Sequence, residues 1–148
     1  MDTICAYLKY DHQRCDDLLI HAETSVAQRN WKDAIENFRQ YQDVLRQHIR
    51  MEEKILLPAF GQTLSGSAEP VAMLRMEHKQ INGMVNRMWE AIQRFDVQDY
   101  VLHSETLTLL MQQHTHKEEE MLYPLLDKAL ACKRSKIISA MAEYLECA

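Results

Sequence analysis

The stretch His48-Ile-Arg-Met-Glu52-Glu-Lys-Ile-Leu-Leu-Pro58 returns as His114-Thr-His-Lys-Glu118-Glu-Glu-Met-Leu-Tyr-Pro124, 66 residues further along the chain. In both copies the His is followed by a Glu four residues later and by a Pro ten residues later. The same offset relates Asp11-His12 to Glu77-His78. We interpret this pattern as an internal duplication in which each half supplies two His and one Glu to one site with near two-fold symmetry.

The composition indicates a helical protein of one domain. A chain of 148 residues can form a single core, and with only three Gly and three Pro it favours helices over strands. The formal net charge is -5, and no stripe of Lys and Arg stands out. Both features argue against nucleic acid as a partner.

Nothing in the sequence indicates a membrane or secretory location. No apolar run approaches the roughly 18–20 residues that a membrane-spanning helix needs. The N-terminus, Met-Asp-Thr-Ile-Cys5, lacks the basic and apolar segments of a signal peptide. The four Cys have no C-x-x-C spacing and are too few for a disulfide scaffold. We therefore expect free thiols in a cytoplasmic protein.

Apolar residues that recur at alternating steps of three and four predict four long helices, each with one stripe facing the core. Thr3, Asn30 and Asp96 are suited to cap the first, second and fourth helices, and Pro70 suits the first turn of the third. The stripe of the third helix is expected to run as far as Phe95.

Prolines and glycines mark where the predicted helices end. Pro58 and Pro124 lack a backbone N–H, so each should kink or end its helix. The stripe of the second helix is expected to continue through Ile55 to Ala59, and that of the fourth through Met121 or Leu122 to Leu125. Residues 61–67 form the clearest loop in the chain.

Four long helices with short connections predict an all-α fold, an antiparallel up-down four-helix bundle over about residues 3–131. A shorter fifth helix is expected over about 134–146, with Ile137, Ile138, Met141 and either Tyr144 or Leu145 buried. It has no counterpart in the duplication. We expect the whole chain, 1–148, to be a single domain.

Six polar residues lie on the apolar stripes themselves, and these are the candidate metal ligands: His12, His48, Glu52, His78, His114 and Glu118. A carboxylate in a core costs several kcal/mol unless it is paired, and no Lys or Arg on these stripes can pair with it. Residues four apart point from the same helix face, so each His-x-x-x-Glu pair can reach one ion. The expected centre has two metal ions bridged by two carboxylates, with two imidazoles on each ion.

Imidazole and carboxylate ligands together suit iron, manganese or zinc. Iron is preferred, because carboxylate-bridged metal pairs in bundle cores are a recurrent iron design. Glu119 is a rival to Glu118 as a ligand, although the duplication favours Glu118.

The neighbours of these residues have simpler interpretations. Glu53 and Glu120 are expected to be solvated. His116 lies about 200° around the helix from His114, so it is expected on the surface. Cys15 shares a stripe with His12 and is expected to be a buried, inert thiol.

These motifs resemble the hemerythrin-like, or HHE cation-binding, family. The resemblance covers about residues 5–130 and consists of Asp11-His12, His48-x-x-x-Glu52-Glu53, Glu77-His78, and His114-x-x-x-Glu118-Glu119 with Leu122-Tyr123-Pro124. It implies a four-helix bundle with a non-haem di-iron centre, bridged by oxo or hydroxo.

The resemblance also bears on function. Oxygen carriers of the family have five His ligands, two of them spaced His-x-x-x-His on the third helix, and this chain has Leu74 where the first of those two would stand. The carriers also place their last carboxylate at the position of Glu119. A set of four His and two Glu looks more like the bacterial proteins that repair iron centres after nitrosative or oxidative stress.

Two functional hypotheses follow. The first is a di-iron protein that binds or reacts with dioxygen, nitric oxide or peroxide, or donates iron, in stress response and iron-centre repair. The second is an iron- or oxygen-sensing interaction module without turnover, whose fifth helix contacts a protein partner. No hydrolase or transferase site is evident, so any catalysis would be redox chemistry at the metals.

Overall fold

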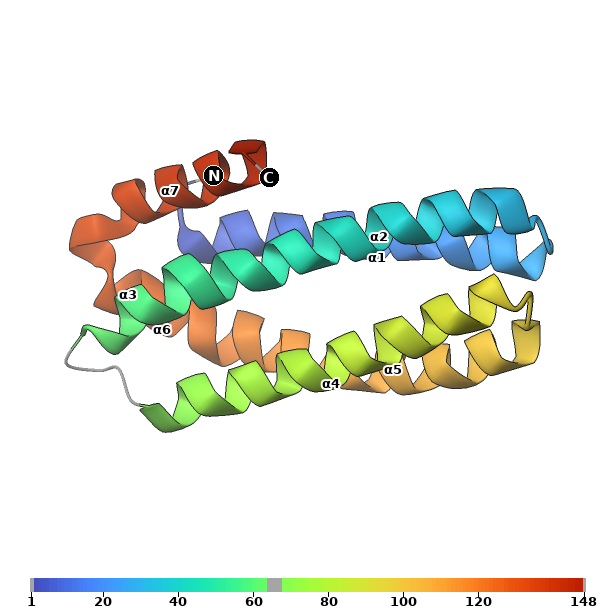
Figure 1. Ribbon diagram of the computed structural model, residues 1–148. Coiled ribbons are helices and arrows are strands. Elements are labelled where there is room, and N and C mark those ends of the chain that lie inside the picture. Colours follow the sequence, from blue (N-terminus) through green and yellow to red (C-terminus); the bar gives the residue numbers. More distant parts are fainter. Residues whose placement is uncertain (1, 64–67, 148) are drawn as a thin grey trace.

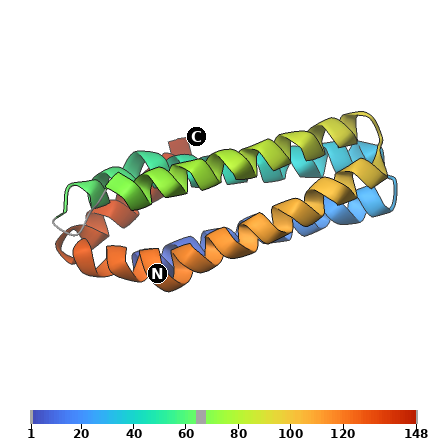
Figure 2. The ribbon, with the colours of Figure 1, turned by 90° about the horizontal axis from the view of Figure 1, so that it is seen from below.

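The computed structural model describes residues 2–63 and 68–147, and every regular element within them is helical. Four long helices lie in two layers (Figure 1): α1 (Ile4–Ala27) with α2 (Trp31–Met51), and α4 (Ala68–Gln93) with α5 (Val97–Lys117). Seen from below, α1 lies behind α5 and α2 behind α4 (Figure 2). The predicted four-helix bundle agrees with this arrangement. None of the described helices is long and apolar enough to cross a membrane.

The helices begin at the predicted capping residues. The side-chain oxygens of Thr3, Asn30 and Asp96 each accept the backbone N–H three residues further on. That N–H has no partner within its own helix, so the side chain satisfies it. All three predicted caps are confirmed.

The turns that end α1 and α4 are copies of one another. Arg29 and Phe95, 66 residues apart, both have a φ of 58°. The N–H of the next residue bonds in each case to the carbonyl five residues back, on Ser25 or Ala91. Such a left-handed residue commonly closes a helix. The prediction that Phe95 belongs to the core stripe was wrong, because it lies beyond the end of α4 and its ring is exposed.

Each half of the chain has a wide, π-helical turn directly after its His-x-x-x-Glu pair. The N–H that closes this turn reaches back five residues instead of four. The residue after it is the predicted Pro, which has no N–H to continue an α-helical ladder. The two turns and the short helices after them are η1 (Glu52–Leu56) with α3 (Leu57–Gly61), and η2 (Glu118–Leu122) with α6 (Tyr123–Ala129).

The extra residue in each wide turn changes which side chains face the core. Ile55 is only half-buried and Leu125 is exposed, although both continue the predicted stripes. Leu57 and Tyr123, which directly follow the turns, are buried instead. The prediction for Leu125 was wrong, because a regular 3.6-residue period does not include the wide turn. Ile55 and Ala59 still pack against the core, although they are only partly buried.

Two apolar clusters fill the bundle. One gathers side chains near the α1–α2 and α4–α5 turns, including Phe38 and Ile92. The other gathers side chains at the opposite end, including Leu8 and Leu126. Along each long helix the candidate ligand stands between residues of the first cluster and residues of the second. The candidate site is therefore a polar layer between two apolar layers.

The C-terminal helix α7 (Arg134–Cys147) follows a short 3-10 turn, η3 (Ala131–Lys133), and lies over α1 and α2 (Figure 1). Ile137 and Met141 are buried in the second cluster, as predicted, and Ile138 and Tyr144 pack against it partly buried. The side chain of Leu145 and residues 64–67 of the predicted loop lie outside the described residues.

Candidate metal centre

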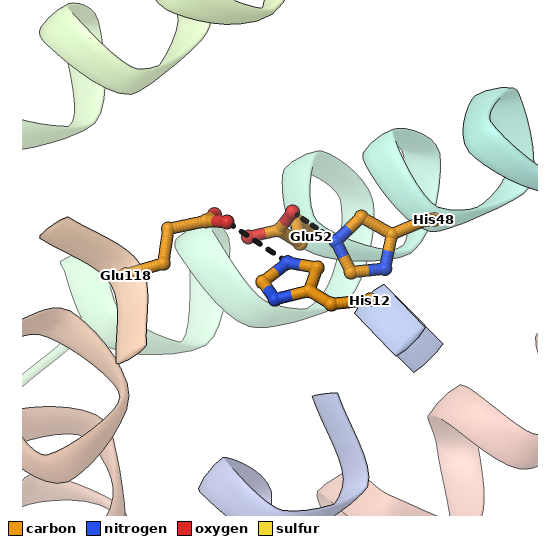
Figure 3. A group of neighbouring side chains, drawn as sticks. All are labelled: His12, His48, Glu52 and Glu118. Atoms are coloured by element: carbon orange, nitrogen blue, oxygen red, sulfur yellow. Dashed lines mark ion pairs between the residues drawn. The ribbon is translucent and has the colours of Figure 1, made fainter. Parts of the chain in front are cut away.

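The six candidate ligands meet in the polar layer, although they come from four helices and two wide turns. Five are buried, and the His12 side chain is 12% exposed. Their ligand atoms form two groups, one around His12 and His48 and one around His78 and His114. Within each group the atoms lie within 4.8 Å of one another, and Glu52 and Glu118 belong to both groups. Figure 3 shows the first group, with both imidazoles directed at the two carboxylates.

The contacts between imidazoles and glutamates follow the duplication. Within the first His-x-x-x-Glu pair the Nε2 atom lies 2.8 Å from Oε1, and within the second pair the distance is 3.2 Å. The other two imidazoles cross to the opposite half. His12 Nε2 lies 3.2 Å from Glu118 Oε1, and His78 Nε2 lies 3.7 Å from Glu52 Oε1. Each glutamate therefore faces an imidazole from both halves of the chain.

The second ring nitrogen of every imidazole bonds to a further carboxylate. A carboxylate oxygen only accepts, so Nδ1 carries the proton and donates it. Partners of this kind fix the tautomer and orientation of metal-binding His residues. The four pairs are His12 with Glu119 at 2.7 Å, His48 with Asp11 at 2.6 Å, His78 with Glu53 at 2.8 Å and His114 with Glu77 at 2.8 Å.

Sequence reasoning missed this outer ring of carboxylates. The prediction that Glu53 is solvated was wrong, because its side chain is only 26% exposed and bonds to an imidazole. Glu119, the rival ligand, instead accepts from Nδ1 of His12. Asp11 and Glu77 were part of the matching motifs but had no assigned role. The available signal was the repeat itself, since all four acids obey the 66-residue offset.

Other neighbours lie where they were expected. Glu120 and His116 are exposed. Cys15 is buried, and burial raises the pKa of its thiol to about 11. The thiol therefore stays protonated at neutral pH, in agreement with an inert, apolar role.

The residues present fit a cation. With Nδ1 donating, a neutral imidazole directs the lone pair of Nε2 at a carboxylate oxygen, and two acceptors repel. Among the described residues, the buried Nε2 atoms of His48 and His78 have no hydrogen-bond partner, nor do Glu52 Oε1 and both carboxylate oxygens of Glu118. Each such atom costs about 1–3 kcal/mol. Two cations, one in each group, would satisfy all five, and the mixed nitrogen and oxygen donors suit iron, manganese or zinc.

In the absence of a cation, protons take its place. Burial alone would lower the pKa of His48, but the charge of Glu52 and the bond to Asp11 hold this pKa well above its usual value. Burial and the nearby Glu118 raise the pKa of Glu52 to about 7. The metal-free centre thus keeps protons that a bound cation would displace.

Tyr123 breaks the symmetry of the centre. Its phenol oxygen lies 3.1 Å from His12 Nε2 and donates to Glu52 Oε2 at 3.3 Å. The side chain is fully buried, and burial, with the charges of Glu52 and Glu118, holds the pKa of the phenol well above its usual value. The duplication places Leu57 at the matching position, which has no polar atom. The sequence indicated Tyr123 only as part of a motif, without a role.

A cavity of about 20 Å³ lies beside the imidazoles. Its apolar wall includes Leu45, Ile49, Ile81 and Met111. Such a volume holds little more than one water-sized molecule. The cavity itself therefore holds only a very small molecule.

The family model described as the hemerythrin HHE cation binding domain matches residues 3–126. The matched part includes all four long helices and all six clustered residues, and it stops before α7. No curated protein and no solved structure matches the chain.

Proposed function

Because the chain belongs to the hemerythrin HHE cation-binding domain family, we propose that it binds two iron ions in the polar layer of an antiparallel bundle. The proposed terminal ligands are the Nε2 atoms of His12, His48, His78 and His114. Glu52 and Glu118 are the proposed bridging ligands, since each belongs to both groups of ligand atoms. Bound iron would supply redox chemistry and coordination positions open to a small molecule. Manganese and zinc are the alternative metals.

The main support for metal binding is that buried atoms in the polar layer lack hydrogen-bond partners within the described part of the chain. Two buried glutamates face four imidazoles, and five of the facing atoms have no hydrogen-bond partner among the described residues. Two buried carboxylates without a counter-ion would be strongly destabilising. Two cations shared between the carboxylates remove that penalty.

The protein's own side chains prepare the centre for small ligands. The outer carboxylates hold each imidazole with Nε2 directed inward, which limits the reorganisation needed on binding. The apolar clusters on both sides keep bulk water out. The adjoining cavity of about 20 Å³ suits dioxygen, nitric oxide or peroxide and is too small for a metabolite.

We further propose that this chemistry serves a stress response, either by reaction with one of these molecules or by donation of iron to damaged iron centres. The proposal is supported by the ligand set of four His and two Glu. Leu74 occupies the position where an oxygen carrier of the family would have a fifth His. Reversible oxygen carriage is therefore not the proposed role.

Substitution Glu52→Ala tests the metal proposal. The variant should lose one or both iron ions, because it removes a carboxylate shared by both groups. Elemental analysis and the absorption spectrum of purified protein measure the loss. Glu120→Ala, an exposed neighbour of the other glutamate, is the matched control and should keep full metal content. Full occupancy in Glu52→Ala would show that Glu52 is not a bridging ligand.

The alternative function is an iron- or oxygen-sensing module without turnover. It is favoured by the position of α7, which packs against α1, α2 and the wide turn η1 that carries Glu52. Loss of iron could therefore change how α7 is held and which partner it binds. A sensor would show iron-dependent partner binding without consumption of dioxygen, nitric oxide or peroxide. A reactive centre would consume one of them when a reductant is supplied.

A further inference from the structure

We propose that Tyr123 is a seventh ligand, whose phenol oxygen binds the ion held by His12 and His48. The two metal positions would then be chemically unequal. This inference depends on the proposed function, since it requires that the chain binds metal. It goes further by assigning a ligand to one position and the open coordination to the other.

The wide turn η2 is what brings Tyr123 to the ligands. Tyr123 follows Glu118 by five residues, and in a regular α-helix two such residues point about 140° apart. The π-helical turn adds one residue to the loop closed by the backbone bond from Tyr123 N–H to the Glu118 carbonyl. As a result Tyr123 faces the centre together with Glu118, and its ring lies 5.7 Å from the His12 ring, centroid to centroid.

The distances match those between neighbouring ligands on one ion. Two donor atoms at right angles, each about 2.1 Å from an octahedral ion, lie about 3 Å apart. The phenol oxygen is 3.1 Å from His12 Nε2 and 3.3 Å from Glu52 Oε2. His12 Nε2 and the carboxylate of Glu52 are themselves proposed ligands of that ion. The phenol oxygen therefore occupies a position that a further ligand of the same ion would take.

Metal binding would also change the partners of the phenol. The phenol has one proton, which it donates to Glu52 Oε2, so its contact with His12 Nε2 is a second, shared one that is lost once Nε2 binds an ion. The hydroxyl group is fully buried and would keep only the longer bond to Glu52. If the phenol proton leaves to solvent, the phenolate oxygen can bond to the ion, and tyrosinate is an established ligand of iron. The negative charge of the phenolate is then neutralised by the cation.

The other half of the chain cannot do the same. Leu57 stands at the matching position and is equally buried. The ion held by His78 and His114 would thus have one protein ligand fewer than its neighbour. All four imidazoles line the small cavity beside the centre, so a molecule in it can reach either ion. The ion with fewer protein ligands has the open position. We therefore assign the binding of the small molecule to this second position.

Resonance Raman spectroscopy of the iron(III)-loaded protein tests the assignment. An iron(III)–phenolate bond gives a visible charge-transfer band, and excitation in that band enhances the ring vibrations of the bound tyrosine. The wild-type protein should show these vibrations, and they should shift when ring-deuterated tyrosine is incorporated. Tyr123→Phe should abolish them. Tyr100→Phe, which removes a different buried tyrosine near the far end of the bundle, should leave them unchanged.

The outcomes separate this inference from the proposed function. Bound iron without tyrosine vibrations in the wild-type protein would overturn the Tyr123 assignment and leave the metal proposal standing. Absence of bound iron in the wild-type protein would overturn both. The isotope experiment uses the natural chain, so it decides the question even if Tyr123→Phe folds poorly.

Discussion

Two of the outer carboxylates, Asp11 and Glu77, each connect an imidazole of the metal centre to a cationic side chain nearer the protein surface. Asp11 receives His48 Nδ1–H on one oxygen and the Arg14 guanidinium on the other, at 2.8 Å. Although burial opposes it, these two partners lower the pKa of Asp11, so the group stays ionised. Glu77 is held in the same way between His114 and Lys117. An ionised partner makes the facing imidazole a better metal donor.

We predict that loss of the charge on Glu77 weakens metal binding. Glu77→Gln keeps an acceptor for His114 Nδ1–H but removes the negative charge. We expect the affinity for metal to fall about 10- to 100-fold, the usual effect of losing such a partner. Competition with a chelator of known affinity measures the change. Glu120→Gln removes the same charge from an exposed site and should leave the affinity unaltered. Equal affinities for the two variants would refute a role for the outer carboxylates.

At the scale of helices and turns, the duplication extends to backbone conformation. The two left-handed residues, the two caps that follow them and the two wide turns all occur 66 residues apart. Neither left-handed residue is a Gly, so a Cβ atom crowds the backbone at both turns. These turns join the helices of each layer at the end of the bundle away from α7 (Figure 1). Relief of the strain at these turns should therefore stabilise the fold without a change in the metal centre.

Arg29→Gly is the corresponding prediction. Glycine adopts the observed φ of 58° without steric cost. After allowance for the greater freedom of glycine in the unfolded chain, the free energy of unfolding should rise by roughly 0.5–1 kcal/mol. Thermal unfolding should show a Tm higher by about 1–4 °C. Arg29→Ala keeps the Cβ and should give no gain, so a similar rise in both variants would contradict the explanation. Phe95 is less suitable, because its ring stacks on Trp31.

The whole molecule depends on the polar layer, because that layer separates its two apolar clusters. All four long helices contribute a side chain to it, so bound ions would tie the α1–α2 layer to the α4–α5 layer. Ions that bind only the folded chain stabilise it by linkage. The metal centre should therefore be structural as well as reactive.

Removal of metal by a chelator tests this coupling. Each ion at 100 times its Kd adds about 2.7 kcal/mol to the free energy of unfolding. For two such ions, the Tm of a chain of this size should fall by roughly 10–20 °C after chelation. Calorimetry of loaded and chelated protein measures the difference. Glu52→Ala should respond much less to the chelator. If the Tm of the natural protein is the same before and after chelation, a metal-free bundle is favoured.

Much of this protein could be predicted from sequence, because periodicity and offset are properties of the chain. The helical stripes, the caps at Thr3, Asn30 and Asp96, and the prolines that disturb two helices follow from local preferences. The fixed offset then matched His12 with His78 and His48 with His114 before any contact was known. Glu52 and Glu118 were predicted to meet a cation because a carboxylate on an apolar stripe requires a counter-charge.

The contacts that these residues make depend on how the helices pack against one another. A stripe gives the angle of a side chain around its own helix, whereas contacts between helices also depend on their relative rotation and shift. Hence the bonds from the imidazoles to Glu53 and Glu119 could not be derived from the sequence pattern. The wide turns have a similar effect, because one added residue rotates everything after it by about 100°. That rotation exposes Leu125 and directs Tyr123 into the metal centre.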